Sequence, residues 1–308
     1  MTSPGGYGPP PGGPVGGPAQ PACVRHPDRP TALSCNRCGR PACPECLREA
    51  AVGYQCVDCV REGNRSTAQV RTVAGARANS RPTPYVTYAL VAINVIVFGV
   101  TAAQAHSIMD NQRSALFNSW ALYGPAVGDG QLIRVLGSGF LHFGPIHLLA
   151  NMFALYIVGR DVELILGRAR YAAVYFVALL GGSASVLALQ PNAATAGASG
   201  AIFGLFGAQA VILLRLKQSP GPVLAIIFIN VVISVSLPGI SLWGHMGGLA
   251  AGTIATAGLL FGPGLVSKGG QSTSSARTIG WVSVAAVAVI VIGVILLRMT
   301  QLHSQLAY

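Results

Sequence analysis

Seven apolar segments between residues 85 and 298 constrain the fold more than any other feature of this sequence. About 20 helical residues rise about 30 Å, the hydrocarbon thickness of a bilayer. Only 9% of the residues are charged, against about 25% in soluble domains. We therefore predict an all-α, polytopic membrane helical bundle, in which the short fourth and fifth helices are tolerable if others enclose them. The predicted spans are residues 85–104, 146–165, 171–190, 199–216, 221–237, 242–262 and 279–298.

The basic residues in the connections predict the orientation of the spans. Arginines and lysines lie before the first span and in every second connection after it, whereas the connections 190–198 and 237–241 carry no charge. Because cytoplasmic loops are enriched in Lys and Arg, we predict a cytoplasmic N-terminus and an external C-terminus. This places a multi-pass protein in the cell membrane, with a long external connection at residues 105–145. The basic residues that support this orientation are Arg61, Arg65, Arg71, Arg77, Arg81, Arg160, Arg168, Arg170, Arg215, Lys217, Lys268 and Arg277.

The region before the first span divides into three parts. Residues 1–22 are rich in Gly and Pro, lack the pattern of a secretory signal and are predicted to be a disordered tail. Residues 23–60 contain all seven cysteines of the chain, and residues 61–84 form a basic linker. The linker arginines could contact anionic cytoplasmic lipid, although a topology signal is the simpler interpretation. A further cytoplasmic connection is expected at residues 263–278, before the last helix and tail at residues 279–308.

The cysteines form four half-sites, each with two ligands three positions apart. Eight thiolate and imidazole ligands suit two tetrahedral zinc sites. A disulfide framework would need an oxidising compartment and would leave His26 unexplained. A module this short has too little core to fold alone, so we expect its metals to drive its folding. The half-sites are Cys23 with His26, Cys35 with Cys38, Cys43 with Cys46, and Cys56 with Cys59.

The spacing of these half-sites resembles the cross-braced B-box type of zinc module over about 37 residues. In that family the first and third half-sites share one zinc ion and the second and fourth share the other. The resemblance implies this interleaved pairing, while the sequence alone also permits sequential pairing.

Four polar residues are expected at one depth, near the outer ends of three spans that run from outside to inside. They are His147 and Asn151 at the start of the second span, Ser199 in the fourth and His245 in the sixth. Polar residues inside a membrane are costly and often functional. Glycines on the fourth and sixth spans would let these two helices approach closely, which would bring His245 within reach of Ser199.

A serine becomes a strong nucleophile when an adjacent base takes its proton. No carboxylate is expected at this depth, because Asp161 and Glu163 fall at the inner end of the second span. The residues therefore predict a Ser199–His245 dyad rather than a triad. His147, Asn151 and the Ser199 backbone N–H could stabilise an oxyanion. A simpler interpretation is that the small residues only pack the helices and that a lone histidine is structural or relays protons.

This combination of motifs resembles the rhomboid family of intramembrane serine proteases over residues 85–262. The seventh helix matches the six-plus-one arrangement of that family. One departure is Ile133 before Arg134, where the family often has tryptophan, which leaves the anchoring of that loop open. The matching residues are Arg134, His142, His147, Asn151, Glu163, Gly197, Ala198, Ser199, Gly200, His245, Gly248 and Gly252.

The resemblance implies an endopeptidase that cleaves transmembrane segments near the outer membrane face. It implies Ser199 as nucleophile, His245 as general base, His147 and Asn151 as oxyanion donors, and a structural or supporting role for His142. No cofactor is expected for catalysis, and the expected partners are transmembrane protein substrates and the lipid bilayer. The zinc module could bind a cytoplasmic protein, whereas nucleic-acid binding is not expected.

Two other functions fit parts of the sequence. A non-catalytic membrane adaptor would bind client helices and recruit partners through the zinc module. A proton-coupled transporter would use the histidines, but the outer half of the predicted bundle offers no acidic residue for it.

Overall fold

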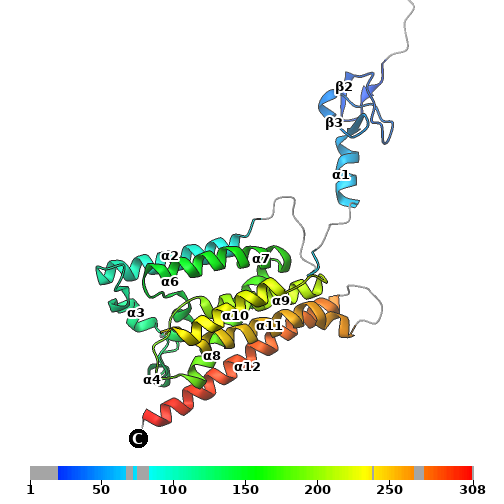
Figure 1. The fold of residues 1–308 in the computed structure, drawn as a ribbon. Helices are drawn as coiled ribbons and strands as arrows, with labels where there is room; N and C mark the ends of the chain where they lie inside the picture. The colour runs from blue at the N-terminus through cyan, green and yellow to red at the C-terminus, as the bar shows by residue number, and fades with distance from the viewer. Residues whose placement is uncertain (1–19, 67–71, 75–82, 238, 267–273, 307–308) are drawn as a thin grey trace, which may run out of the picture. The chain divides into compact units, whose positions relative to one another are not determined.

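A computed structural model describes residues 20–66, 72–74, 83–237, 239–266 and 274–306 (Figure 1). The chain forms two compact units, one within residues 1–69 and one within residues 70–308. The predicted disordered tail lies almost wholly outside the described residues, as do parts of the predicted linker at 61–84 and of the connection at 263–278.

The first unit is small and built around its cysteines. Strands β1 (Ala22–Cys23) and β2 (His26–Pro30) pair antiparallel, as do β3 (Leu47–Glu49) and β4 (Tyr54–Cys56). A 3-10 turn, η1 (Pro44–Cys46), precedes β3, and helix α1 (Val57–Ser66) follows β4 into the predicted linker. Its buried core consists of six cysteines with Ala42 and Leu47. So little apolar surface cannot stabilise a domain without a further constraint, such as bound metal.

The second unit is a bundle in which each of the seven predicted apolar segments forms a helix, which confirms the predicted fold class. The last helix is longer than predicted at both ends. The second segment is built of three consecutive pieces, α6, the π-helical η4 and α7. The helices are α2 (Tyr85–Ala105), α6 (Gly144–Ala154), η4 (Leu155–Gly159), α7 (Arg160–Leu166), α8 (Arg168–Leu189), α9 (Ser199–Arg215), α10 (Gly221–Ser236), α11 (Leu242–Val266) and α12 (Ser274–Leu306).

Several of these helices are apolar enough to cross a membrane. Within the described residues, three helical segments are each long and apolar enough to cross a membrane: α2, α8 and Thr278–Gln305 of α12. The pieces Ile133–Phe140 and Gly144–Leu166 are long and apolar enough only when taken together, and they are bent by 87° relative to each other. Helices α9 and α10 are shorter apolar helices. Apolar side chains on the outside of the bundle, such as Ile96 and Phe228, suit contact with lipid tails. The chain is a multi-pass membrane protein.

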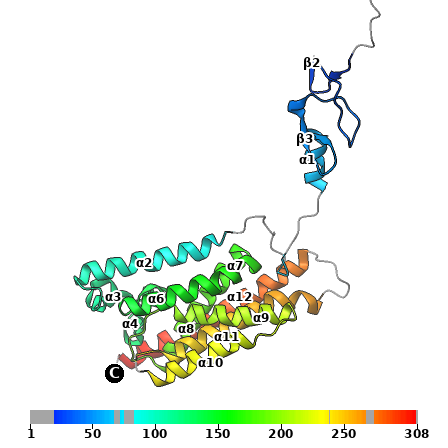
Figure 2. The ribbon, with the colours of Figure 1, turned by 45° about the horizontal axis from the view of Figure 1, so that its top comes forward.

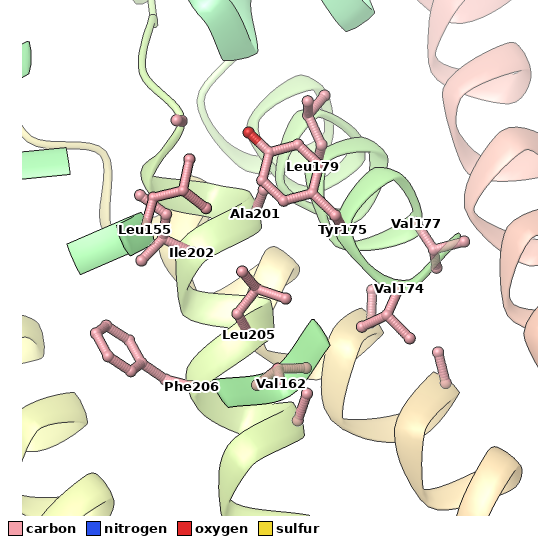
Figure 3. Packing of buried hydrophobic residues seen from close by; sticks show 14 of the residues in the cluster. Leu155, Val162, Val174, Tyr175, Val177, Leu179, Ala201, Ile202, Leu205 and Phe206 are labelled. Carbon is pink, nitrogen blue, oxygen red and sulfur yellow. The ribbon is translucent and has the colours of Figure 1, made fainter. Parts of the chain in front are cut away.

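Helices α9 and α11 form the centre of the bundle. They pack against each other and against α8, and Figure 2 shows α9, α10 and α11 side by side. Figure 3 shows Leu155 of η4, Tyr175 of α8 and Leu205 of α9 in the same apolar core. Most of α9 is buried, as expected for a short enclosed helix. Helix α10 is not enclosed in this way, because it packs on one side of the bundle and only Val223 and Ser234 are buried.

The predicted external connection folds into short helical pieces that hold the segment before α9. Backbone hydrogen bonds join Leu122 to Thr195 in both directions, at 2.9 Å each, and Gly124 N–H donates to Pro191 O at 2.8 Å. The start of α9 is therefore fixed by a part of the chain far away in the sequence. The pieces are η2 (Asn111–Arg113), α3 (Ala115–Trp120), α4 (Gly124–Gly128), α5 (Ile133–Gly137) and η3 (Ser138–Phe140).

Candidate functional site

Ser199 is the first residue of α9, and the turn before it needs a glycine. Gly197 has φ of +139°, a conformation that side chains with a Cβ rarely adopt. Its N–H donates to Ser138 O at 2.9 Å, which ties the turn to η3. The Ser199 side chain is thus presented at a helix N-terminus, on backbone that two separate segments hold in place.

Glycines allow α9 and α11 to approach until their backbones touch. A Cβ on Gly248 would overlap the carbonyl oxygen of Gly200. A Cβ on Gly252 would lie 2.5 Å from both Cα and O of Gly204, well inside van der Waals contact. The close contact predicted from the glycine pattern is therefore present in the fold, and it sets the distance between the side chains at the N-terminal ends of the two helices.

This contact places Ser199 and His245 in direct hydrogen-bond contact. The distance from Ser199 Oγ to His245 Nε2 is 2.8 Å. The imidazole is buried, and the ring of Phe203 stacks on it with centroids 4.1 Å apart and planes 9° from parallel. The other ring nitrogen, Nδ1, lies 2.8 Å from Ser234 Oγ on α10. In this arrangement Ser199 can transfer its proton to the imidazole of His245. Phe203 contacts the face of that ring and Ser234 contacts its Nδ1 edge.

His147, at the start of α6, lies beside the serine. A Cβ on Gly197 would be 3.0 Å from His147 Nε2 and 3.5 Å from Ser199 Oγ, so both atoms border the space next to Gly197. Nδ1 of His147 accepts a hydrogen bond from the Phe143 N–H at 3.3 Å. An accepting Nδ1 in a neutral imidazole leaves the proton on Nε2. Nε2, which borders the same space as Ser199 Oγ, is therefore a hydrogen-bond donor.

Asn151 and His142 contact His147 from two sides. Asn151 is buried and its Nδ2 donates to His147 O at 3.0 Å, which uses one of its two amide hydrogens. Across the described chain, no hydrogen bond joins Asn151 to Ser199 or His245. His142 is fully buried and packs edge-on against the His147 ring, with centroids 5.1 Å apart. Its carbonyl accepts from Asn111 Nδ2 at 2.8 Å, which anchors this loop.

Arg134 holds the predicted external connection together. Its Nη1 donates to Asn118 O at 2.7 Å and to Ala121 O at 2.8 Å, and its Nε donates to Gln131 Oε1 at 2.8 Å. These carbonyls lie at the C-terminal end of α3, where a cation also interacts favourably with the helix dipole. Arg134 therefore connects α5 to α3 although Ile133 precedes it.

Glu163 lies in the middle of α7 and has a separate task. It is buried, and its two carboxylate oxygens accept hydrogen bonds from Val86 N at 3.0 Å and from Thr87 N and Oγ1 at 2.8 Å each. It thereby caps the N-terminus of α2. Within the part of the chain that is described, no carboxylate bonds to His245, whose edge partner is a hydroxyl.

The eight cysteine and histidine ligands of the first unit form two clusters. One holds Cys23, His26, Cys43 and Cys46, and the other holds Cys35, Cys38, Cys56 and Cys59. Within each cluster the ligand atoms lie within 4.8 Å of one another, so each could hold one metal ion. The half-sites are interleaved, as the B-box resemblance implies, and the sequential alternative is wrong.

The distances in both clusters suit a small tetrahedral ion. Nδ1 of His26 lies 3.4 Å from the sulfurs of Cys43 and Cys46, and the sulfurs of Cys38 and Cys56 are 3.8 Å apart. A tetrahedron of Zn–S bonds about 2.3 Å long separates its sulfurs by about 3.8 Å.

The thiols differ in how readily they ionise before metal binds. Hydrogen bonds from backbone N–H groups, first that of Cys43, lower the pKa of Cys23 to about 6. Burial raises the pKa of Cys46 to about 11 and that of Cys59 to about 12. A bound cation would bring the protonated thiols to the thiolate form that metals require.

Two contact residues of His245 were not identified from the sequence. Phe203 lies four residues after Ser199, one turn along α9, and reads as an ordinary core residue. Ser234 is an isolated hydroxyl in an apolar helix, which is a weak signal of function. Only the packing of α10 beside α11 shows that it meets His245.

Comparison with known proteins identifies the membrane unit. Residues 129–262 match the family model described as the rhomboid domain. The chain carries a rhomboid domain. This domain includes every membrane residue singled out above from Arg134 to Gly252, whereas the metal clusters lie outside the matched region.

Curated relatives resemble parts of the chain. The sequence is 32% identical to "Rhomboid protease GluP" of Bacillus subtilis (strain 168) over 196 residues, which cover 62% of this chain and 38% of the relative. It is 34% identical to "RHOMBOID-like protein 4" of Arabidopsis thaliana over 137 residues, 42% of this chain and 34% of the relative. It is 30% identical to "RHOMBOID-like protein 7" of the same plant over 173 residues, 54% of this chain and 55% of the relative. The chain thus spans a third to just over half of the length of these relatives.

Proposed function

We propose that this protein is an intramembrane serine endopeptidase that cleaves transmembrane segments of membrane proteins with a Ser199–His245 dyad. The observation that carries the proposal is the 2.8 Å contact between Ser199 Oγ and His245 Nε2 inside an apolar bundle. The rhomboid domain match and the relative named as a rhomboid protease support it. An adaptor would need the rhomboid fold but not this contact.

In the first half of the reaction, Ser199 Oγ attacks the carbonyl carbon of the scissile peptide bond while its proton passes to His245 Nε2. The tetrahedral intermediate then collapses, and Nε2 gives the proton to the departing amine. In the second half, water attacks the acyl-enzyme and loses a proton to Nε2. The proton returns to Ser199 Oγ as the acid product leaves, so the enzyme ends in its starting state.

The negative oxygen of the tetrahedral intermediate needs hydrogen-bond donors, and two candidates border the serine. We assign this role to His147 Nε2–H, whose position beside Gly197 and Ser199 supports it, and to the Ser199 backbone N–H at the start of α9. The remaining amide hydrogen of Asn151 is the third proposed donor. Such donors typically contribute 10²- to 10³-fold each to kcat. His142 would act by packing against His147.

We further propose that cleavage takes place near the outer membrane face, with the N-terminus in the cytoplasm. The distribution of basic residues supports this orientation. Ser199, His147 and His245 all lie near the first residues of helices α9, α6 and α11, which run in the same direction under this topology. The two metal clusters would then face a reducing compartment, where thiols stay free to bind metal.

We propose zinc as the metal of both clusters and a structural role for it. The donor sets of three cysteines with one histidine, and of four cysteines, are typical of closed structural zinc sites. A cytoplasmic protein is the proposed partner of this module.

A cleavage assay tests the proposal. The full-length protein would be reconstituted in liposomes with a panel of single-span membrane proteins tagged at both ends. The expected result is cleavage within or beside the apolar segment, near its external end, that disappears in Ser199→Ala and His245→Ala proteins. Cleavage that persists in Ser199→Ala would contradict the proposal, and client binding without cleavage would favour the adaptor.

A further inference from the structure

His245 is held along its edge by a residue that the proposed dyad does not use. Ser234 of α10 places Oγ 2.8 Å from His245 Nδ1, on the opposite side of the ring from Ser199. Both side chains are buried, with 5% of Ser234 and 7% of His245 exposed. The contact is therefore shielded from water, which would otherwise compete for both groups.

Counting protons fixes the direction of each hydrogen bond. The hydroxyl of Ser234 has one hydrogen, and it donates that hydrogen to Asn230 O at 2.7 Å. Ser234 Oγ can then only accept from His245, so Nδ1 carries the ring proton. A neutral imidazole has one N–H, so Nε2 is unprotonated and able to accept the proton of Ser199. The chain of bonds runs from Ser199 through His245 and Ser234 to the carbonyl of Asn230.

We propose that Ser234 is a positioning residue that holds His245 in the tautomer and orientation needed to activate Ser199. It occupies the place that a carboxylate has in a Ser-His-Asp triad, with a neutral oxygen as the acceptor for Nδ1–H. The proposal rests on the proposed function, because it concerns the base of that reaction. It adds a third side chain to the Ser199–His245 pair, and a fourth helix, α10, to a site otherwise built on α6, α9 and α11.

The alternative is that the Ser234 hydroxyl serves only to form the hydrogen bond to Asn230 O within its own helix. Serine and threonine in membrane helices often donate to the carbonyl four residues earlier, as Thr253 does to Leu249 at 2.6 Å. Ser234 differs because its oxygen also meets a ring nitrogen, and because it is one of two buried side chains on α10. A residue with only a local role would not need to face the base.

The effect can be measured without knowing a substrate. A fluorophosphonate reacts with an activated serine, so its inactivation rate constant (kinact) and its apparent binding constant (KI) can be determined on the full-length protein. Ser234→Val and Ser234→Thr are nearly the same shape and differ in the hydroxyl. Thr253→Val is a matched control, because it removes a similar hydroxyl from the helix that carries His245 without touching the dyad.

We expect Ser234→Val to lower kinact about tenfold with KI unchanged, since losing a buried hydrogen bond that orients a base costs about one factor of ten. Ser234→Thr should stay within about twofold of wild type, as should Thr253→Val. Equal kinact for Ser234→Val and Ser234→Thr, with wild type labelled at Ser199, would overturn the proposal and leave the dyad intact. A folded wild-type protein that is never labelled would instead contradict the proposed function itself.

A measurement on the unaltered chain keeps the test valid if the variants fail to fold. Nitrogen-15 spectra of histidine-labelled protein, assigned with a His245→Asn variant, report which ring nitrogen carries the proton. A protonated Nδ1 and a bare Nε2 are expected for neutral His245. A proton on Nε2 would contradict the role assigned to Ser234.

Discussion

Replacing Gly252 by alanine should disable the site from a distance of two helical turns. A Cβ at this position would lie 2.5 Å from Cα and O of Gly204, whereas ordinary contacts begin at 3.4 Å. Neither neighbour is a flexible side chain, so α9 and α11 would have to separate by about 1 Å at this point. Ser199 and His245 lie on the same two helices and are 2.8 Å apart, so a similar displacement would take them out of hydrogen-bond range.

The expected loss follows from that displacement. A misplacement of about 1 Å between reacting groups can cost about 10²-fold in rate, so Gly252→Ala should slow fluorophosphonate labelling of Ser199 by about that factor. Alanine favours a helix by about 1 kcal/mol over glycine, while overpacking costs about 1 to 3 kcal/mol. The protein should therefore keep its helix content and show a slightly lower thermal midpoint.

Gly99→Ala provides the matched control. Gly99 lies within α2, and a Cβ there would meet nothing within 4 Å. Its labelling rate should equal that of wild type. A Gly252→Ala protein that folds and is labelled at the wild-type rate would refute the idea that glycine contact sets the dyad distance.

Three further outcomes are expected. Cys23→Ser with Cys43→Ser should retain one zinc ion per chain, whereas Cys23→Ser with Cys35→Ser should retain none, because the clusters are interleaved; equal metal content would contradict this. Arg134→Ala should slow Ser199 labelling severalfold and speed proteolysis in residues 105–145, since two hydrogen bonds from α5 to the C-terminal end of α3 and a third to Gln131 are lost; unchanged protection would count against that role. Glu163→Gln should lower the free energy of unfolding by about 1.5 to 3 kcal/mol, because an amide cannot accept on both of its ends; an unchanged thermal midpoint would count against it.

The positions of the helices could be predicted because most of the apolar runs are about as long as a bilayer is thick. The pairing of α9 with α11 was also predictable, since Gly248 and Gly252 share the face of His245 on a helix. The short pieces between residues 105 and 145 were not, because helices of three to six residues show too little periodicity to be recognised.

Other features depend on tertiary contacts that no local pattern contains. The sequence allowed sequential or interleaved metal half-sites, and only the folded module brings Cys23 to Cys43. The exposed position of α10 follows from the packing of its neighbours, not from its own apolar sequence. Ser234 becomes notable only when α10 lies beside α11, because nothing within residues 221–236 indicates a histidine partner.

The central claim is that Ser199 is an activated nucleophile with His245 as its base. The most direct measurement is to treat the purified protein with a fluorophosphonate and locate the adduct by mass spectrometry, with Ser199→Ala and His245→Ala proteins alongside. The expected result is a single adduct on Ser199 that is absent from both variants. An adduct on Ser199 that persists in His245→Ala, or none on a folded wild-type protein whose site admits the probe, would contradict it.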